Sequence, residues 1–291
     1  MPLGHLLLAL VVVAIWGFNF VVIKVGLADV PPLFLTALRF VFAALPAVFL
    51  LKRPAVPWRL LIGFGLIFGV VKFGLLFVGM KAGMPAGLSS IVLQMQAFFT
   101  IGFAFLVLGE RPVPIQYLGA AVAIAGITLI GAVRWQGASL LPFLLVIGAA
   151  ACWGVSNILT KKAGRIDMLA FIVWISLVPI LPLLVLSLAF EGPSAIAATL
   201  AHPSWTAIGA VAYLAIPTTL FGYGVWSWLL SRHPAATVAP LTLLVPIFGM
   251  GSAALVLGEP FGGMEMTGAA LVFVGLVVNV LGPRLALRLR T

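Results

Sequence analysis

Two basic side chains stand inside long apolar stretches, where a charged group is energetically costly. Lys72 lies near the centre of one stretch, and Arg39 lies towards one end of another. Ionisable residues at such depth usually face the protein interior or water, and they mark a pathway. Lys72 is therefore the stronger candidate for binding a carboxylate. For Arg39 the alternative is a long side chain that reaches out to the membrane surface.

A second set of candidates combines an aromatic ring with an amide on one helical face. Asn19 follows Trp16 by three residues, and Asn157 follows Trp153 by four, so each pair lies on one side of a helix. Such a face offers an aromatic wall and hydrogen-bonding groups to a small polar molecule. The alternative is packing, in which the glycine after each Trp allows close helix approach. The two roles are compatible, and the pattern does not separate them.

Polar residues in two further apolar stretches complete the candidate site. Gln94 and Gln96 lie near the centre of one stretch, and an unpartnered amide in hydrocarbon is costly. We therefore expect at least one of them to face a neighbouring helix or a cavity. Thr219 and Tyr223 follow Pro217, which can loosen its helix. Tyr223 could also belong to an aromatic belt at the membrane surface.

Motifs for covalent chemistry or ATP hydrolysis are absent from the sequence. It has no Gly-x-x-x-x-Gly-Lys-[Ser/Thr] loop and no His-Glu-x-x-His, and Cys152 has no second cysteine to pair with. We therefore expect no cofactor, no metal and no enzymatic activity. The six acidic residues fall in connections or at the ends of apolar stretches, so none is placed for a proton relay. For Glu110 and Glu259 we expect structural roles, as helix caps or ion-pair partners.

The composition indicates that lipid surrounds most of the chain. Of its 291 residues, 64% are hydrophobic and 8% are charged, whereas about 25% are charged in a soluble domain. A membrane-spanning helix needs roughly 20 apolar residues, so about ten such helices would occupy nearly all of the chain. The apolar stretches predict an all-α membrane protein with helices at 6–27, 33–51, 59–80, 87–108, 114–132, 140–162, 169–189, 205–230, 236–257 and 264–283.

The net charge of +10 reflects the orientation of the chain in the membrane and not affinity for nucleic acid, since the basic residues are scattered between apolar stretches. Most of them fall on one side of the membrane if both termini are cytoplasmic, as the positive-inside rule requires. The inside set is Lys52, Arg53, Arg59, Arg111, Lys161, Lys162, Arg165, Arg232, Arg284, Arg288 and Arg290, and the outside set is Lys24, Lys81 and Arg134.

The chain also repeats itself. Matching stretches occur in the same order in its two halves: Trp16–Asn19 with Trp153–Ser156, Leu108–Glu110 with Leu257–Glu259, Gly119 with Gly268, and Gly126 with Gly275. Because each half holds five predicted helices, an odd number, the second half enters the membrane from the opposite side. We therefore expect two inverted repeats, at 1–134 and 138–285, around a central cavity, an architecture that recurs in secondary transporters.

Several short stretches point to a family, namely Trp16–Phe20, Pro31–Leu33, Leu38–Phe40, Met84–Leu88 and Gln96–Phe99. They resemble the EamA type of the drug/metabolite transporter superfamily, above all bacterial exporters of cysteine and O-acetylserine. Aromatic amino acid exporters are the next resemblance. Resemblance to this family implies ten helices, cytoplasmic termini, a bacterial inner membrane and efflux of amino acids or their relatives.

These observations together predict a facilitative carrier that exports neutral amino acids or their derivatives by alternating access, working as a monomer. Its partners are a small-molecule substrate and membrane lipid. Alternatives are efflux of small hydrophobic drugs, an intramembrane enzyme, and a passive channel. The predicted substrate-binding residues are Trp16, Asn19, Lys72, Gln94, Gln96, Trp153, Asn157, Thr219 and Tyr223.

Overall fold

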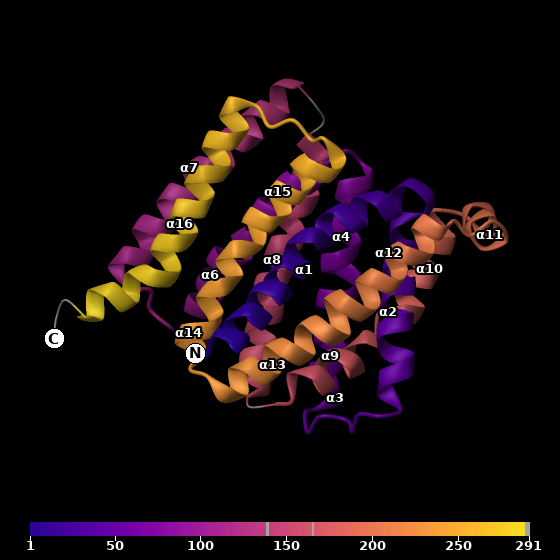
Figure 1. Cartoon of the computed structure of the whole chain (residues 1–291), viewed down its shortest axis with the longest axis horizontal. Helices are drawn as coiled ribbons and strands as arrows, with labels where there is room; N and C mark the ends of the chain where they lie inside the picture. Colours follow the sequence, from indigo (N-terminus) through magenta and orange to yellow (C-terminus); the bar gives the residue numbers. More distant parts are fainter. Residues whose placement is uncertain (138–139, 165, 289–291) are drawn as a thin grey trace.

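The computed structural model describes residues 1–137, 140–164 and 166–288, and these ranges hold helices and no strand (Figure 1). The expected start of the second repeat, at 138, lies outside them. The first half contains α1 (Leu3–Asp29), α2 (Pro32–Val48), α3 (Trp58–Phe64), η1 (Gly65–Lys72), α4 (Phe73–Lys81), α5 (Ala86–Val92), η2 (Leu93–Met95), α6 (Gln96–Leu108) and α7 (Pro114–Gly137). The second half contains α8 (Leu140–Ala163), α9 (Met168–Ser176), α10 (Ile180–Phe190), α11 (Pro193–Ala201), α12 (Trp205–Ala215), η3 (Ile216–Phe221), α13 (Gly222–Arg232), α14 (Ala235–Val238), η4 (Ala239–Leu244), α15 (Val245–Leu257) and α16 (Gly263–Arg288).

Within the described ranges, nine helical segments are long and apolar enough to cross a membrane. The tenth predicted stretch forms α2, an apolar helix of 17 residues, which is shorter than the roughly 20 residues of an ordinary span. The polar connection after α10 contains the short helix α11, which projects at one edge of the molecule (Figure 1). We refer to this side, with the connections after α1, α4 and α10, as the α11 end.

Several of the long helical segments change their hydrogen-bonding register along their length. The π-helix η1 joins α3 to α4, and the π-helix η3 joins α12 to α13. The 3₁₀ helices η2 and η4 interrupt two further segments. A π segment redirects side chains relative to a regular helix and is frequent at functional sites. Lys72 closes η1 and Thr219 lies in η3.

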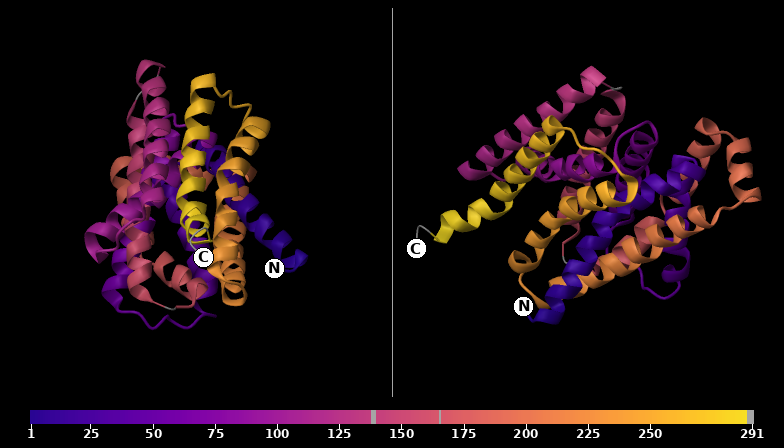
Figure 2. Two further views of the ribbon diagram at one scale, coloured as in Figure 1. Left: turned by 90° about the vertical axis from the view of Figure 1, so that its left-hand side faces the viewer. Right: turned by 45° about the horizontal axis from the view of Figure 1, so that its top comes forward.

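Helices α7 and α16 form an antiparallel pair that runs side by side in all views (Figures 1 and 2). Glycines let their backbones touch. A Cβ atom at Gly119 would lie 2.7 Å from the Gly275 carbonyl oxygen, and one at Gly126 would lie 2.5 Å from the Gly268 carbonyl oxygen. Larger residues at these positions would force the two helices apart.

We predict that Gly126→Leu lowers the apparent melting temperature of the purified protein, because overpacking a close contact costs about 1–3 kcal/mol. The control is Gly102→Leu in α6, where an added Cβ meets no atom within 4 Å. It should be neutral or stabilising, since leucine favours helix more than glycine does. Thermal unfolding in detergent, followed by tryptophan fluorescence, measures both variants. Equal melting temperatures would contradict the close packing of α7 and α16.

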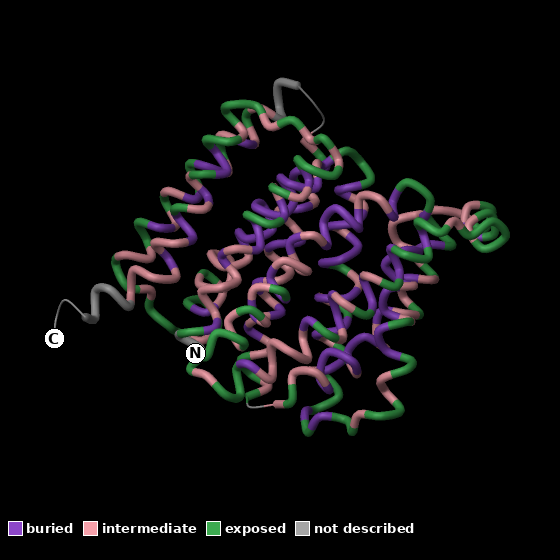
Figure 3. Tube along the Cα trace, viewed as in Figure 1, coloured by how far each residue is buried: buried purple, intermediate pink, exposed green. Residues whose placement is uncertain are grey.

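The buried side chains concentrate where α1, α2, α4 and the π segments cross, whereas α11 is largely exposed (Figure 3). Phe77 and Leu76 of α4 and Leu35 of α2 are almost fully buried there. In a chain this apolar, exposed hydrophobic residues such as Leu106 and Leu255 are expected on the lipid-facing surface. Polar groups inside this core therefore stand out as candidates for function.

Candidate functional site

Lys72 places its ammonium group among three aromatic rings. Its Nζ atom lies 3.3 Å from the ring centroid of Phe73, 4.5 Å from that of Trp153 and 4.9 Å from that of Phe68. The residue is only 3% exposed, and within the described ranges it has no hydrogen-bond acceptor and no ion-pair partner. Ring faces attract a cation, but they do not neutralise its charge.

Arg39 lies on the same aromatic ring, so the membrane-surface alternative raised by the sequence is wrong. Its guanidinium carbon is 4.1 Å from the Phe73 centroid, and its Nη2 donates to Thr219 Oγ1 at 3.2 Å. The residue is 3% exposed. Among the described residues, its Nε and Nη1 atoms are buried without a partner. Burial of this kind leaves two donors that a ligand could engage.

Three further rings extend the site from Arg39 towards α1 and α13. The centroid of Trp16 lies 5.5 Å from that of Tyr223 and 5.1 Å from that of Trp226. Trp16 is fixed by its indole N–H, which donates to the carbonyl oxygen of Thr218 at 3.0 Å. The three rings are half-buried rather than sealed. One group of rings thus surrounds Lys72, and a second group reaches Arg39 through Tyr223.

The register of η3 positions Thr219 for this arrangement. Its hydroxyl donates to the Leu214 carbonyl oxygen at 2.8 Å, five residues earlier in the chain, and accepts the hydrogen bond from Arg39. The hydroxyl of the neighbouring Thr218 is buried without a partner in the described part of the chain. The π segment thus places the Thr219 hydroxyl on Arg39, while the Thr218 hydroxyl makes no hydrogen bond in the described part of the chain.

The predicted site residues divide into two groups. Trp16, Lys72, Trp153, Thr219 and Tyr223 belong to the cluster around Arg39.

The remaining predicted residues have other contacts. Asn157 donates to Gln96 Oε1 at 2.7 Å and to Thr100 Oγ1 at 2.9 Å, so these residues join α8 to α6. Gln94 and Asn19 are buried in η2 and α1, and the Asn19 amide oxygen has no hydrogen-bond partner within the described ranges. Arg39, Phe73 and Trp226, absent from the predicted set, complete the cluster. The sequence signal for Arg39 was its charge inside an apolar stretch.

No acidic side chain neutralises the two buried cations, because all six acidic residues are described and bound elsewhere. Their contacts are Asp29 with the Ser204 hydroxyl, Glu110 with Lys161, Asp167 with the first turn of α9, Glu191 with the first turn of α2, Glu259 with the first turn of α5, and Glu265 with the Gly262 backbone. Arg39 and Lys72 are therefore buried basic side chains without an acidic partner among the described residues.

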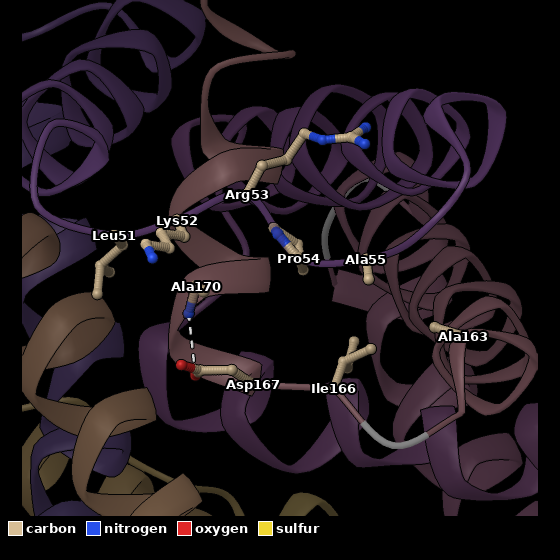
Figure 4. A pocket seen from close by; sticks show the side chains of 9 residues that line it. All are labelled: Leu51, Lys52, Arg53, Pro54, Ala55, Ala163, Ile166, Asp167 and Ala170. Carbon is tan, nitrogen blue, oxygen red and sulfur yellow. Dashed lines mark hydrogen bonds between the residues drawn. The ribbon is translucent and has the colours of Figure 1, made fainter.

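Two surface pockets lie apart from this cluster. One of about 380 Å³ lies between the α2–α3 and α8–α9 connections and includes Lys52 and Asp167 (Figure 4). Asp167 is already engaged there, since it accepts from the Ala170 backbone N–H at 3.2 Å. The other, of about 460 Å³, lies at the α11 end and includes Lys81 and Glu191. The described residues contain no group of three His, Cys, Asp or Glu side chains that could hold a metal ion.

Comparison with known proteins identifies the family. The pattern of the EamA-like transporter family matches residues 3–132 and again residues 140–281. The chain belongs to the EamA-like transporter family. This EamA-family chain is 45% identical over 283 residues to a Salmonella typhimurium protein named "Probable amino-acid metabolite efflux pump", with 95% of each chain covered. An Escherichia coli K12 protein of the same name is 44% identical, with the same coverage.

The fold of the EamA-family chain is shared with a solved crystal structure. The two chains match over 100% of both lengths with a TM-score of 0.65 and 20% sequence identity. The family match and the apolar helices together make the chain a multi-pass membrane transporter with a small-molecule substrate. It is not an enzyme.

Proposed function

We propose that this EamA-family protein exports amino acids or their metabolites across the bacterial inner membrane, and that Arg39 and Lys72 bind the carboxylate of the cargo. The observation that carries the proposal is the pair of buried cations without an acidic partner. An uncompensated buried charge is strongly destabilising, and a bound carboxylate would compensate it. The names of the two relatives at 45% and 44% identity agree with a carboxylate-bearing cargo. Neutral zwitterionic amino acids belong to this class.

The proposed mechanism is alternating access by two inverted repeats of five helices, 1–134 and 138–285, with α2 as the tenth span. Symmetric contacts support it. The contact of Gly119 with Gly275 becomes that of Gly268 with Gly126 when the matched halves are exchanged. The π-helices η1 and η3 likewise lie in the third span of each half. Inverted halves can exchange conformations and so open a central site to either side.

The direct test is counterflow in proteoliposomes. Vesicles loaded with an unlabelled amino acid or O-acyl amino acid should transiently concentrate the labelled compound from outside, because a carrier exchanges one for the other. A channel or an enzyme cannot do so. Exchange of a hydrophobic dye instead of amino acids would support the drug-efflux alternative. Absence of amino acid counterflow in protein that is folded by tryptophan fluorescence would refute the proposal.

The proposed orientation places both termini in the cytoplasm, because most basic residues fall in connections on that side of the membrane. The start of α1 and the end of α16 lie towards the same side of the molecule (Figure 1). Residues Arg165 and Arg290, and the side chains of Arg134, Arg284 and Arg288, lie outside the described part of the structure.

We predict that Thr291→Cys, in a Cys152→Ala background, reacts with a membrane-impermeant maleimide only after the cells are opened. The physical reason is the excess of basic residues on the inner side, which are retained in the cytoplasm during insertion. Gel-shift labelling of intact and lysed cells measures the outcome. Labelling of intact cells would reverse the orientation.

A further inference from the structure

The charge of the preferred cargo can be inferred from the same cluster, provided that the proposed function holds. Arg39 and Lys72 bring two positive charges to the site, and no acidic side chain of the protein faces them. A zwitterion would add one negative and one positive charge, leaving the total unchanged. A cargo with net negative charge would lower it, and opposite charges gain most where water is excluded.

The hydrogen-bonding groups lead to the same conclusion independently. Arg39 offers two buried donors without partners in the described chain, and the contacts of the Lys72 ammonium group there are with aromatic rings. Two acceptors are already used, since the hydroxyl of Thr219 accepts from Arg39 and the carbonyl oxygen of Thr218 accepts from Trp16. The Thr218 hydroxyl is without a partner in the described chain, so unpartnered donors outnumber unpartnered acceptors around Arg39. An ammonium group carries three donors and no acceptor. The site therefore suits a molecule rich in oxygen acceptors and poor in N–H donors.

The aromatic surface offers only a partial alternative for an ammonium group. Phe68, Phe73 and Trp153 already surround Lys72, so further cations would be repelled there. Within the described ranges no cation lies over Trp16, Tyr223 or Trp226, but Tyr223 is close to the positively charged Arg39. Their half-buried faces suit an apolar or amide group better than a second charge.

We propose that the preferred cargo is a carboxylate with net negative charge, of which an N-acylated amino acid is the simplest example. Its carboxylate binds between Arg39 and Lys72. Its amine is masked as an amide, which removes the positive charge and adds a carbonyl acceptor. The acyl group and side chain lie against Trp16, Tyr223 and Trp226.

A net-anionic cargo also supplies an energy source that needs no proton relay. In a uniporter the charge moved in each cycle is the charge of the cargo. The interior of a bacterium is negative, so the membrane potential drives an anion outwards. One elementary charge moving across about 100 mV corresponds to an equilibrium ratio of about 50-fold. A zwitterion gains nothing from the potential.

The test uses proteoliposomes containing the full chain, with a potassium diffusion potential of about 100 mV set by valinomycin, positive inside, and equal pH on both sides. Labelled N-acetylserine is expected to accumulate inside towards a ratio of about 50-fold. Labelled serine is expected to equilibrate without accumulation. Protein-free vesicles give the background for both compounds.

Each outcome separates the two proposals. Counterflow of serine without uptake of N-acetylserine would overturn the anionic cargo but leave the proposed export function intact. Uptake of N-acetylserine that ignores the potential would overturn potential-driven uniport. Failure of both compounds in folded protein would refute the proposed function itself.

A variant adds a readout that misfolding does not imitate. Lys72→Gln removes one positive charge and keeps a hydrogen-bond donor, so it should reduce the preference for N-acetylserine over serine at least tenfold. The matched control, Lys161→Gln, removes a positive charge from an exposed ion pair and should keep the preference of the native protein. An unchanged preference in Lys72→Gln would overturn the assignment of Lys72 to the anion.

Discussion

Replacement of Arg39 with methionine is expected to lower counterflow of carboxylate cargo by about 10- to 150-fold at subsaturating concentration. A hydrogen bond to a charged group contributes about 1.5–3 kcal/mol, and Arg39 has two buried donors available for such bonds. Methionine fills a similar volume without charge. Arg39 has no acidic partner in the described chain, so an apolar replacement removes the cost of an uncompensated buried charge, and the melting temperature should not fall. Initial counterflow rates and thermal unfolding test the two parts.

The control for charge is Arg59→Met, since Arg59 is exposed in α3 and lies outside the cluster. Its counterflow rate should stay within about twofold of the native rate, because an exposed charge contributes little. A second control uses the methyl ester of the same amino acid, which lacks the carboxylate. The counterflow rate of the ester should be similar in Arg39→Met and in the native protein. Equal losses for acid and ester would assign Arg39 to structure rather than to binding.

Hydropathy predicted the helical segments well because lipid imposes a simple rule on each span. Every predicted apolar stretch overlaps helix in the structure, although α2 ends at Val48 and the stretch at 169–189 is interrupted between α9 and α10. The rule does not reveal the π-helix η1, since Gly65–Lys72 reads as an ordinary apolar stretch. In η3, Pro217 gave a partial signal, because proline removes a backbone donor and loosens the helix. The π register depends on packing around the segment.

The members of the cluster around Arg39 could be predicted only in part, for a reason visible at Arg39. A charge inside an apolar stretch is recognisable from sequence, but the direction of its side chain depends on helix rotation and on neighbours distant in sequence. Here the neighbours are Thr219 and Phe73. The pair Gln96 and Asn157 shows the opposite case, since two buried amides satisfy each other. Sequence alone could not distinguish such a pair from groups that line a site.

The matched glycines of the two Trp-Gly pairs support the packing role that the sequence suggested. A Cβ atom at Gly17 would lie 2.5 Å from Phe248 Cβ, and one at Gly154 would lie 2.8 Å from Phe99 Cβ. Close packing is therefore real in both halves. Trp16 nevertheless faces Tyr223, so the glycine packs one side of the helix while the Trp contributes to the cluster on another.

The two repeat-related carboxylates make different contacts at the two ends of the molecule. Glu259 accepts from the backbone N–H groups of Ala86 at 2.7 Å and Gly87 at 2.9 Å, which ties the second half to the first turn of α5. Glu110 instead pairs with Lys161 at 2.5 Å, where the side chains are 48% and 54% exposed. Exposed ion pairs contribute about 0.2–1 kcal/mol, less than charge-assisted bonds at a helix N-terminus.

Glu259→Gln is therefore expected to favour opening at the α11 end by about 10- to 150-fold, the equivalent of about 1.5–3 kcal/mol. Glutamine keeps one acceptor oxygen and turns an NH₂ group towards the other backbone N–H. The reporter is Val92→Cys, buried in α5, in a Cys152→Ala background. Its labelling by an impermeant maleimide outside intact cells should accelerate accordingly. Glu110→Gln, the repeat-related control, should accelerate it less than about fivefold. Equal acceleration in both variants would mean that Glu259 does not hold this end closed.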